Sequence, residues 1–322
     1  MKVLVTGGTG FLGKNVRNEL EKTNEFDVLY TSRNIIDLDK NITLGNILDP
    51  NRVVELYEYF QPDAILHMAA SCGGILANKN SPAEFLSQNI QMGLNIFNGI
   101  VKYKQKNKEW NPLVYTLGSV CSYPKYCSVP FKEDSIWNGY PEETNAPYGH
   151  AKKTLLMLQD IYREQYGIRG AHLILANLYG KFDQFDPVNS HVIPAMIRKV
   201  YFAKKNQREN VELWGSGQVT REFLYAEDCA KYLVQAIKME LNYALPINLG
   251  TGNDISIIEL AQLIVTIMDY HGDLVFLNNG LDGQPKRRLD VSRAKSVFGF
   301  DAETSLEDGL RKTIAWYEGE QL

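Results

Sequence analysis

The chain has few cysteines, no surplus of positive charge and no long hydrophobic run, and each shortage excludes a class of protein. Its 34 Lys and Arg residues are outnumbered by 38 Asp and Glu residues, for a formal net charge of -4. Nucleic-acid-binding proteins usually carry a basic surplus, so we expect no nucleic-acid partner. No apolar run reaches the roughly 18 residues of a membrane span, so we expect no membrane association. The N-terminus leads directly into an expected strand with no signal peptide, which favours a cytoplasmic location.

The cysteines are too few and too scattered for a metal site. Only four are present. Cys121 and Cys127 are six positions apart, and neither Cys72 nor Cys229 belongs to a matching pair. We therefore expect no bound metal, and free thiols in a reducing compartment.

Short apolar strands alternate with longer helices in the first half of the chain. Expected strands cover 2–6, 27–30, 63–67, 113–117 and 171–175, and expected helices cover 11–22, 50–60, 82–104 and 146–165. This alternation predicts an α/β fold with a doubly wound parallel sheet. After about residue 180 the pattern is less regular, with helices expected near 192–205, 226–240 and 256–270. We expect a Rossmann-type domain over 1–180, with parts of 221–250, and a smaller α/β domain over 181–322.

A glycine-rich turn directly follows the first expected strand. Gly7, Gly10 and Gly13 form the pattern G-x-x-G-x-x-G between that strand and a helix. Such glycines let the backbone approach a pyrophosphate, and the helix N-terminus supplies free N–H groups and a positive dipole end. We therefore expect a dinucleotide cofactor, contacted by Gly7, Gly8, Thr9, Gly10, Phe11, Leu12 and Gly13.

The end of the second expected strand bears on the choice between NADP and NAD. NAD enzymes usually place Asp or Glu there, on the ribose 2′-hydroxyl. Here residues 30–34 are Tyr, Thr, Ser, Arg and Asn, and the first acid is Asp37. Arg33 offers a guanidinium that can hold a 2′-phosphate through two hydrogen bonds. NADP is therefore the favoured cofactor, and NAD, with Arg33 as an ordinary surface residue, is the alternative.

Three further residues indicate redox chemistry at a carbonyl or hydroxyl group. Tyr148 and Lys152 are four positions apart in an expected helix, so their side chains share one face. We expect the lysine ammonium to lower the pKa of the phenol, which would let tyrosine exchange a proton near neutral pH. Ser119 follows the expected strand 113–117, at the sheet edge where ligands bind in such folds. Its hydroxyl can hydrogen-bond a substrate carbonyl, so these residues indicate a nicotinamide-dependent enzyme.

These residues resemble the extended short-chain dehydrogenase/reductases, and more narrowly the GDP-L-fucose synthases, the GDP-4-keto-6-deoxymannose 3,5-epimerase/4-reductases. The resemblance covers nearly the whole chain. The hexapeptide Asn189-Ser190-His191-Val192-Ile193-Pro194 is unusual among general short-chain reductases. Together with Cys121, two positions after the serine, it singles out this subfamily. The other matching motifs are 118–125, 145–148, 177–180, 214–217 and 221–224.

The resemblance implies an epimerisation followed by a reduction. A 4-keto group acidifies the C3 and C5 protons of the sugar, and Cys121 and His191 match the base and acid that invert these centres. NADPH then delivers hydride to C4, while Tyr148 donates the proton, Ser119 steadies the oxygen and Lys152 holds the nicotinamide ribose. Further implied cofactor contacts are Leu117, Gly118, Leu175, Asn177, Leu178 and His191. Implied contacts to the GDP-sugar are Ser119, Asn177, Lys199, Trp214, Arg221 and Asp282.

Two departures from the family pattern keep neighbouring substrates open. Gly7-Gly8-Thr9-Gly10 stands where the family usually has Gly-His-Arg-Gly, so Arg33 is left to hold the 2′-phosphate. Lys199 stands where the family tends to have arginine, which keeps the charge but loses bidentate geometry. The main alternative is a C4 reductase with little or no epimerisation, acting on a GDP-4-keto-heptose or a 3,6-dideoxy sugar. An epimerase or dehydratase with recycled NAD and a non-catalytic nucleotide sensor are more distant alternatives.

The resemblance also implies a homodimer, in which helices near 84–104 and 148–165 pair across a two-fold axis. The apolar positions available for that surface are Phe85, Ile90, Leu94, Ile96, Leu155, Leu156, Leu158 and Ile161. The same positions could instead pack on the protein's own sheet. The basic run 286–288 has two interpretations as well: it adds positive potential at the GDP site, or it is a solvated loop.

Overall fold

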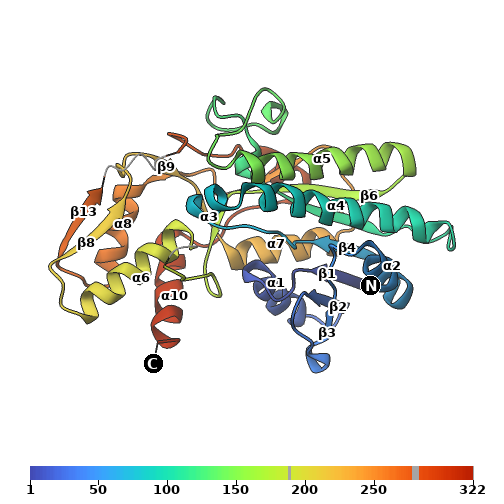
Figure 1. The fold of residues 1–322 in the computed structure, drawn as a ribbon, viewed down its shortest axis with the longest axis horizontal. Coiled ribbons are helices and arrows are strands. Elements are labelled where there is room, and N and C mark those ends of the chain that lie inside the picture. Colours follow the sequence, from blue (N-terminus) through green and yellow to red (C-terminus); the bar gives the residue numbers. More distant parts are fainter. Residues whose placement is uncertain (188–189, 278–282, 322) are drawn as a thin grey trace.

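A seven-stranded parallel sheet forms the centre of the structure (Figure 1). The computed structural model describes residues 1–187, 190–277 and 283–321. In spatial order the strands are β11 (Ile247–Leu249), β6 (Arg169–Leu175), β5 (Leu113–Ser119), β4 (Ala64–His67), β1 (Lys2–Thr6), β2 (Asp27–Ser32) and β3 (Ile42–Leu44). Every neighbouring pair is parallel. The predicted parallel, doubly wound α/β sheet is confirmed.

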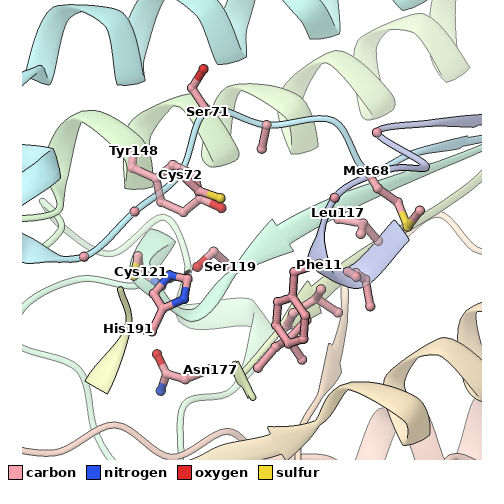
Figure 2. Close-up of a pocket in the computed structure, with 18 of the residues that line it drawn as sticks. Phe11, Met68, Ser71, Cys72, Leu117, Ser119, Cys121, Tyr148, Asn177 and His191 are labelled. Carbon is pink, nitrogen blue, oxygen red and sulfur yellow. Dashed lines mark hydrogen bonds between the residues drawn. The ribbon is translucent and has the colours of Figure 1, made fainter. Parts of the chain in front are cut away.

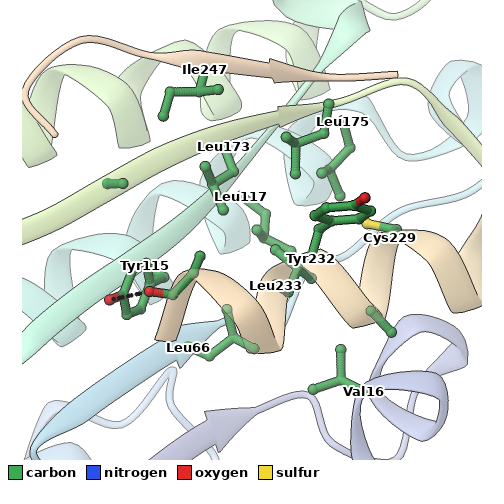
Figure 3. Packing of buried hydrophobic residues seen from close by; sticks show 14 of the residues in the cluster. Val16, Leu66, Tyr115, Leu117, Leu173, Leu175, Cys229, Tyr232, Leu233 and Ile247 are labelled. Carbon is green, nitrogen blue, oxygen red and sulfur yellow. Dashed lines mark hydrogen bonds between the residues drawn. The ribbon is translucent and has the colours of Figure 1, made fainter. Parts of the chain in front are cut away.

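Helices cover both faces of this sheet, which explains why its inner strands are apolar on both sides. One face packs against α1 (Phe11–Glu21) and α7 (Ala226–Lys238). The other packs against α2 (Pro50–Phe60), α4 (Pro82–Lys104) and α5 (Ala146–Tyr166). Alternation along β1 shows the two layers: Val3 and Val5 belong to the first hydrophobic cluster and Leu4 to the second. Figure 3 shows the first cluster, where Tyr232 and Leu233 of α7 meet Leu117 and Leu173.

A separate hydrophobic cluster lies beyond the carboxyl edge of the sheet, at the left of Figure 1. It joins α6 (Val192–Lys205), α8 (Ile257–Ile267) and α10 (Leu306–Gly319) with the parallel pair β8 (Asn210–Trp214) and β13 (Asp273–Leu277). Between the cluster and the large sheet, β7 (Asn177–Tyr179) pairs with β10 (Phe223–Tyr225), and β9 (Thr220–Arg221) pairs with β12 (Ile255–Ser256). The chain therefore returns to the large sheet through α7 and β11. The boundary at residue 180 stays a prediction.

The sequence predicted most of the long elements and missed the short ones, together with the 14-residue helix α10. Elements that it did not predict are β3, β7 to β13, α3 (Ile75–Asn80), α9 (Ser292–Phe298) and α10. All eight missed strands have two to five residues. So short a run shows no periodicity that separates it from a loop. They form because the chain places them beside a partner strand.

Several apolar positions considered for a subunit interface are buried within the subunit. Phe85, Ile96, Leu155, Leu156 and Leu158 are each less than a tenth exposed and pack in the protein's own core. Close contact between α4 and α5 explains this burial. These positions cannot form an interface, so any such surface must come from the outward faces of the two helices.

Candidate active site

A cavity of about 600 Å³ lies at the carboxyl edge of the large sheet. Its wall combines the glycine-rich turn, the ends of β2, β4, β5 and β6, and the starts of α5 and α6. The predicted site residues on this wall are Gly7, Thr9, Gly10, Phe11, Leu12, Gly13, Arg33, Leu117, Gly118, Ser119, Cys121, Tyr148, Lys152, Leu175, Asn177, Leu178, His191, Lys199, Trp214 and Arg221. Gly8 does not line the cavity, and Asp282 lies outside the described residues.

The glycine-rich turn is shaped by backbone contacts that a side chain would prevent. Gly7 has φ +75°, and a Cβ there would lie 2.9 Å from the Cα of Ala69. A Cβ on Gly13 would lie 2.2 Å from the carbonyl oxygen of Gly7. At Gly8 a Cβ would meet the Tyr30 side chain at 2.8 Å, so packing on β2 explains that glycine. The turn is a closely packed cradle at the N-terminus of α1, as a pyrophosphate site requires.

The end of β2 forms the neighbouring part of the wall. The Thr9 hydroxyl donates to Ser32 Oγ at 3.2 Å, and the same oxygen accepts from the backbone N–H groups of Asn34 and Ile35 at 3.4 and 3.3 Å. The exposed side chain of Arg33 stands at the rim. Hydroxyl, N–H and guanidinium donors therefore occur together where the ribose of a dinucleotide is expected.

The charges on the described wall have one sign. Its charged side chains are Arg33, Lys152, Lys199, Arg221 and Arg287, and no Asp or Glu of the described residues lines it. Fixed cations around a concave site attract phosphate groups. The cavity therefore suits ligands with several phosphates.

Ser119, Tyr148 and Lys152 meet in the middle of the cavity, where Figure 2 shows Ser119 and Tyr148 facing the same space. Ser119 ends β5, and its Oγ accepts a hydrogen bond from the Cys121 N–H at 3.2 Å. Tyr148 and Lys152 lie in the first turns of α5, with Lys152 Nζ 5.6 Å from the Tyr148 ring centroid. The expected shared face is confirmed.

The expectation that Lys152 brings the pKa of Tyr148 down toward neutral pH is wrong. Burial, followed by the nearby Cys72 and Cys121, raises the pKa of Tyr148 well above its ordinary value. Burial also lowers the pKa of Lys152 to about 8, against a smaller opposing effect of Cys72. Desolvation dominates because both side chains lie inside the fold. Tyr148 therefore keeps its proton at neutral pH, which suits a proton donor.

Cys121 has a buried cationic neighbour that the sequence did not single out. Arg287, 5% exposed, donates from Nη1 to Cys121 Sγ at 3.4 Å and from Nε to Gln284 Oε1 at 3.0 Å. Its Nη2 forms an ion pair with Glu142 at 3.8 Å. For Arg287, this supports the interpretation that the basic run 286–288 adds positive potential to the site. Lys286 and Arg288 instead form ion pairs with Asp254, at 3.2 and 3.4 Å.

His191 stands at the N-cap of α6, beside Cys121 and Ser119 in Figure 2. Its Nδ1 lies 3.5 Å from Asp183 Oδ1. Burial opposes the charged form, but the hydrogen bond and negative charge of Asp183 prevail and raise the pKa of His191 above its ordinary value. One cavity therefore holds a thiol beside a cation, Arg287, and an imidazole beside an anion, Asp183.

The end of the cavity away from the glycine-rich turn combines the flat ring of Trp214 with positively charged side chains. Trp214 is 47% exposed, and Lys199 Nζ lies 4.8 Å from its ring centroid. The same Nζ donates to the Glu212 carbonyl at 2.8 Å, and burial lowers the pKa of Lys199. Arg221 lines the wall nearby and donates from Nη1 to the Thr220 carbonyl at 2.8 Å. An aromatic face beside cations can hold a nucleobase and a diphosphate.

The loop after β4 was not predicted to line the site. Met68, Ala69, Ala70, Ser71 and Cys72 all do so. Ser71 Oγ donates to Gln88 Oε1 at 2.7 Å, and its N–H donates to Asn89 Oδ1 at 3.0 Å, which ties the loop to α4. The rule that ligands bind at the carboxyl ends of parallel strands would have found this loop.

Two features are absent from the described residues. No helix there combines the length and apolar character of a membrane span. No group of His, Cys, Asp and Glu in the same residues has the arrangement of a metal site.

Comparison with known proteins places these features in a family. Residues 3–250 match the model of the NAD dependent epimerase/dehydratase family. GDP-L-colitose synthase of Yersinia pseudotuberculosis is 35% identical over 100% of this chain and 99% of its own length. GDP-L-fucose synthase of Escherichia coli K12 is 35% identical over 98% and 96%. The solved structure of GDP-mannoheptose C4 reductase from Campylobacter jejuni, with NADP bound, has a TM-score of 0.81 and 26% identity over 98% of each chain. This chain belongs to the NAD dependent epimerase/dehydratase family.

Proposed function

We propose that this protein is an NADP-dependent enzyme that epimerises C3 and C5 of a GDP-4-keto-6-deoxymannose-type sugar and reduces C4, giving GDP-L-fucose or a close analogue. The observation that carries the proposal is the meeting of Cys121 and His191 with Ser119, Tyr148 and Lys152 in one cavity. Ser119, Tyr148 and Lys152 alone would be compatible with the reduction of many substrates. The added thiol and imidazole are what a double epimerisation requires.

The cavity fits a phosphorylated dinucleotide at the end formed by the glycine-rich turn. The turn leaves space that a Cβ at Gly7 or Gly13 would fill, and Arg33 and Ser32 stand where a 2′-phosphate is expected. When bound, NADPH supplies the hydride for C4. Lys152 holds its ribose, and NADP is proposed over NAD because no carboxylate of the described residues faces that ribose.

The residues of the cavity divide the proposed chemistry between them. Cys121 takes a proton from the carbon next to the keto group, and His191 returns one to the opposite face, so each inversion breaks one C–H bond and forms another. Ser119 hydrogen-bonds the keto oxygen. Tyr148, whose pKa is raised by burial, then donates its proton to that oxygen during reduction.

The GDP part of the substrate is assigned to the far end. Trp214 offers its face to the base, while Lys199 and Arg221 attract the diphosphate. Asn177 and Asp282 are the other proposed sugar-nucleotide contacts. The relatives that carry fucose and colitose synthase names support a GDP-sugar over other nucleotide-sugars.

A second candidate is a GDP-4-keto-sugar C4 reductase with little or no epimerisation. It is supported by the similarity to the GDP-mannoheptose C4 reductase and by lysine in place of arginine at position 199. The two candidates share the cofactor end and Tyr148. They differ in whether Cys121 is needed.

The proposed assembly is a homodimer through the outward faces of α4 and α5. Leu86, Met157 and Ile161 are 37%, 47% and 46% exposed, and Ile90 and Leu94 are half-buried. Leu86, Ile90 and Leu94 follow one another at four-residue spacing, so they form one stripe on α4. A cytoplasmic location is supported by the four thiols, all free, since a reducing compartment keeps Cys121 unmodified.

The proposal is tested by incubating the protein with GDP-4-keto-6-deoxymannose and NADPH in heavy water. Deuterium at C3 and C5 with one NADPH oxidised per product is the expected result. NADPH oxidation without deuterium would establish the second candidate. If neither deuterium incorporation nor NADPH oxidation occurs, both candidate functions are rejected for this sugar. A GDP-4-keto-heptose would then be the next substrate to test.

A Cys121→Ser variant separates the two steps. It should abolish deuterium incorporation and spare reduction of a substrate that already has its final configuration at C3 and C5. Cys127→Ser is the matched control, because this half-buried thiol does not line the cavity.

A further inference from the structure

Asp183 is a buried carboxylate directly behind the cavity wall at His191. It lies in the segment between β7 and α6, and its side chain is 3% exposed, against 44% for His191. Its Oδ1 accepts from the Gln184 N–H at 2.8 Å and lies 3.5 Å from His191 Nδ1. Its Oδ2 is buried with no hydrogen-bond partner among the described residues. Such a group is costly to bury unless a cation lies close to it.

The charges around His191 explain why a carboxylate is needed there. The titratable and charged side chains that share the cavity with it are Lys199 of its own helix α6 and, from other segments, Arg33, Cys72, Cys121, Tyr148, Lys152, Arg221 and Arg287. The fixed charges among them are cations, which disfavour an imidazolium. Asp183 is the carboxylate placed to offset them, and the pKa of His191 is raised accordingly.

We propose that Asp183 is a positioning residue that holds His191 by Nδ1, leaves Nε2 to face the sugar, and supplies the ring in its protonated form as the acid of the epimerisation. This role rests on the proposed function. A neutral imidazole could accept a proton but not return one. The Asp183–His191 pair therefore complements Cys121, whose sulfur faces the guanidinium of Arg287.

The direct test is an NMR titration of the histidine ring signals in the wild-type protein and in Asp183→Asn. His191→Gln assigns the His191 signal. The side-chain amide oxygen introduced by Asp183→Asn can still accept from the Gln184 N–H, so the variant removes the charge and keeps the shape. The titration midpoint of His191 is expected above the ordinary histidine value in the wild type and clearly lower in the variant. An unchanged midpoint would overturn the proposal. This result does not depend on turnover, so it stands apart from any failure of the proposed function.

The catalytic test compares deuterium incorporation with hydride transfer across pH. At a pH below the lower midpoint of the variant, both proteins should hold a protonated His191 and exchange at similar rates. As pH rises to 7, Asp183→Asn should fall at least about tenfold below the wild type in deuterium incorporation, approaching the roughly 100-fold or greater loss of a general acid. Reduction should fall less. A uniform loss of both activities at all pH values would indicate a merely structural role and reject the proposal.

Two controls sharpen the comparison. Asp301→Asn breaks an exposed ion pair with Lys295 and should leave both the titration and the pH profile unchanged. Asp183→Glu keeps the carboxylate and should restore the high midpoint. If Asp183→Asn fails to fold, the smaller neutral Asp183→Ser repeats the measurement.

Discussion

The two ends of the cavity are built in different ways. At the cofactor end, the wall is backbone, and glycines at positions 7 and 13 allow contacts that any side chain would block. At the sugar end, the wall is made of individual side chains, among them Trp214, Lys199 and Arg221. A backbone site depends on shape, and a side-chain site depends on separate chemical groups. Substitutions should therefore act sterically at one end and group by group at the other.

The largest effect is expected where the two ends meet. Tyr148→Phe should lower the rate of C4 reduction about a thousandfold, because the proton donor is lost. NADPH binding should change little, since the ring stays in place. Stopped-flow hydride transfer and fluorescence titration of NADPH measure the two quantities. An equal loss of both would contradict the assigned role.

At the cofactor end, Gly13→Ala should weaken NADPH binding by about tenfold to a hundredfold. The new Cβ would lie 2.2 Å from the Gly7 oxygen, so the turn must move. Gly319→Ala, at the end of α10, is the matched control, because nothing lies within 4 Å of its added Cβ. Calorimetric titration of both variants checks this. Equal affinities would mean that the turn is not a steric cradle.

At the sugar end, Trp214→Ala should raise KM for the GDP-sugar by about tenfold or less, with kcat nearly unchanged. The reason is that a half-exposed ring contributes stacking worth about 1 kcal/mol. NADPH affinity should not respond. Steady-state kinetics with each ligand varied in turn distinguishes the two ends, and a matching loss of NADPH affinity would remove the distinction.

The smallest effect concerns pH. Lys152 has a pKa of about 8 in this structure, lowered by burial, so the ammonium is present below that pH and is lost above it. NADPH affinity should therefore decline a few-fold between pH 7 and 9, as the charge near the cofactor disappears. In Lys152→Met the affinity should be weaker and flat over this range. A wild-type affinity that did not change with pH would contradict the assignment.

The same comparison explains what could be predicted from the sequence. The cofactor end could be predicted, because it consists of a local glycine pattern and of strands long enough to be recognised by their apolar residues. Arg287 and Cys121 are 166 positions apart, and nothing local in the sequence shows that they meet. Asp183 is eight residues before His191, but its burial depends on tertiary packing. The burial that raises the pKa of Tyr148, where a lowered pKa was expected, is likewise a property of the folded chain.

The cationic side chains of the cavity wall have a kinetic consequence. The protein as a whole carries a formal charge of -4, which repels extended polyanions, yet the charged side chains among the described residues of the cavity wall are all cationic. Small phosphorylated molecules are thus drawn toward the entrance by a local field, while long anionic polymers meet a repulsive exterior. Added salt should slow the capture of both ligands, since ionic screening shortens the reach of that field to about 10 Å at 0.1 M. Encounter, and not only binding, is selective.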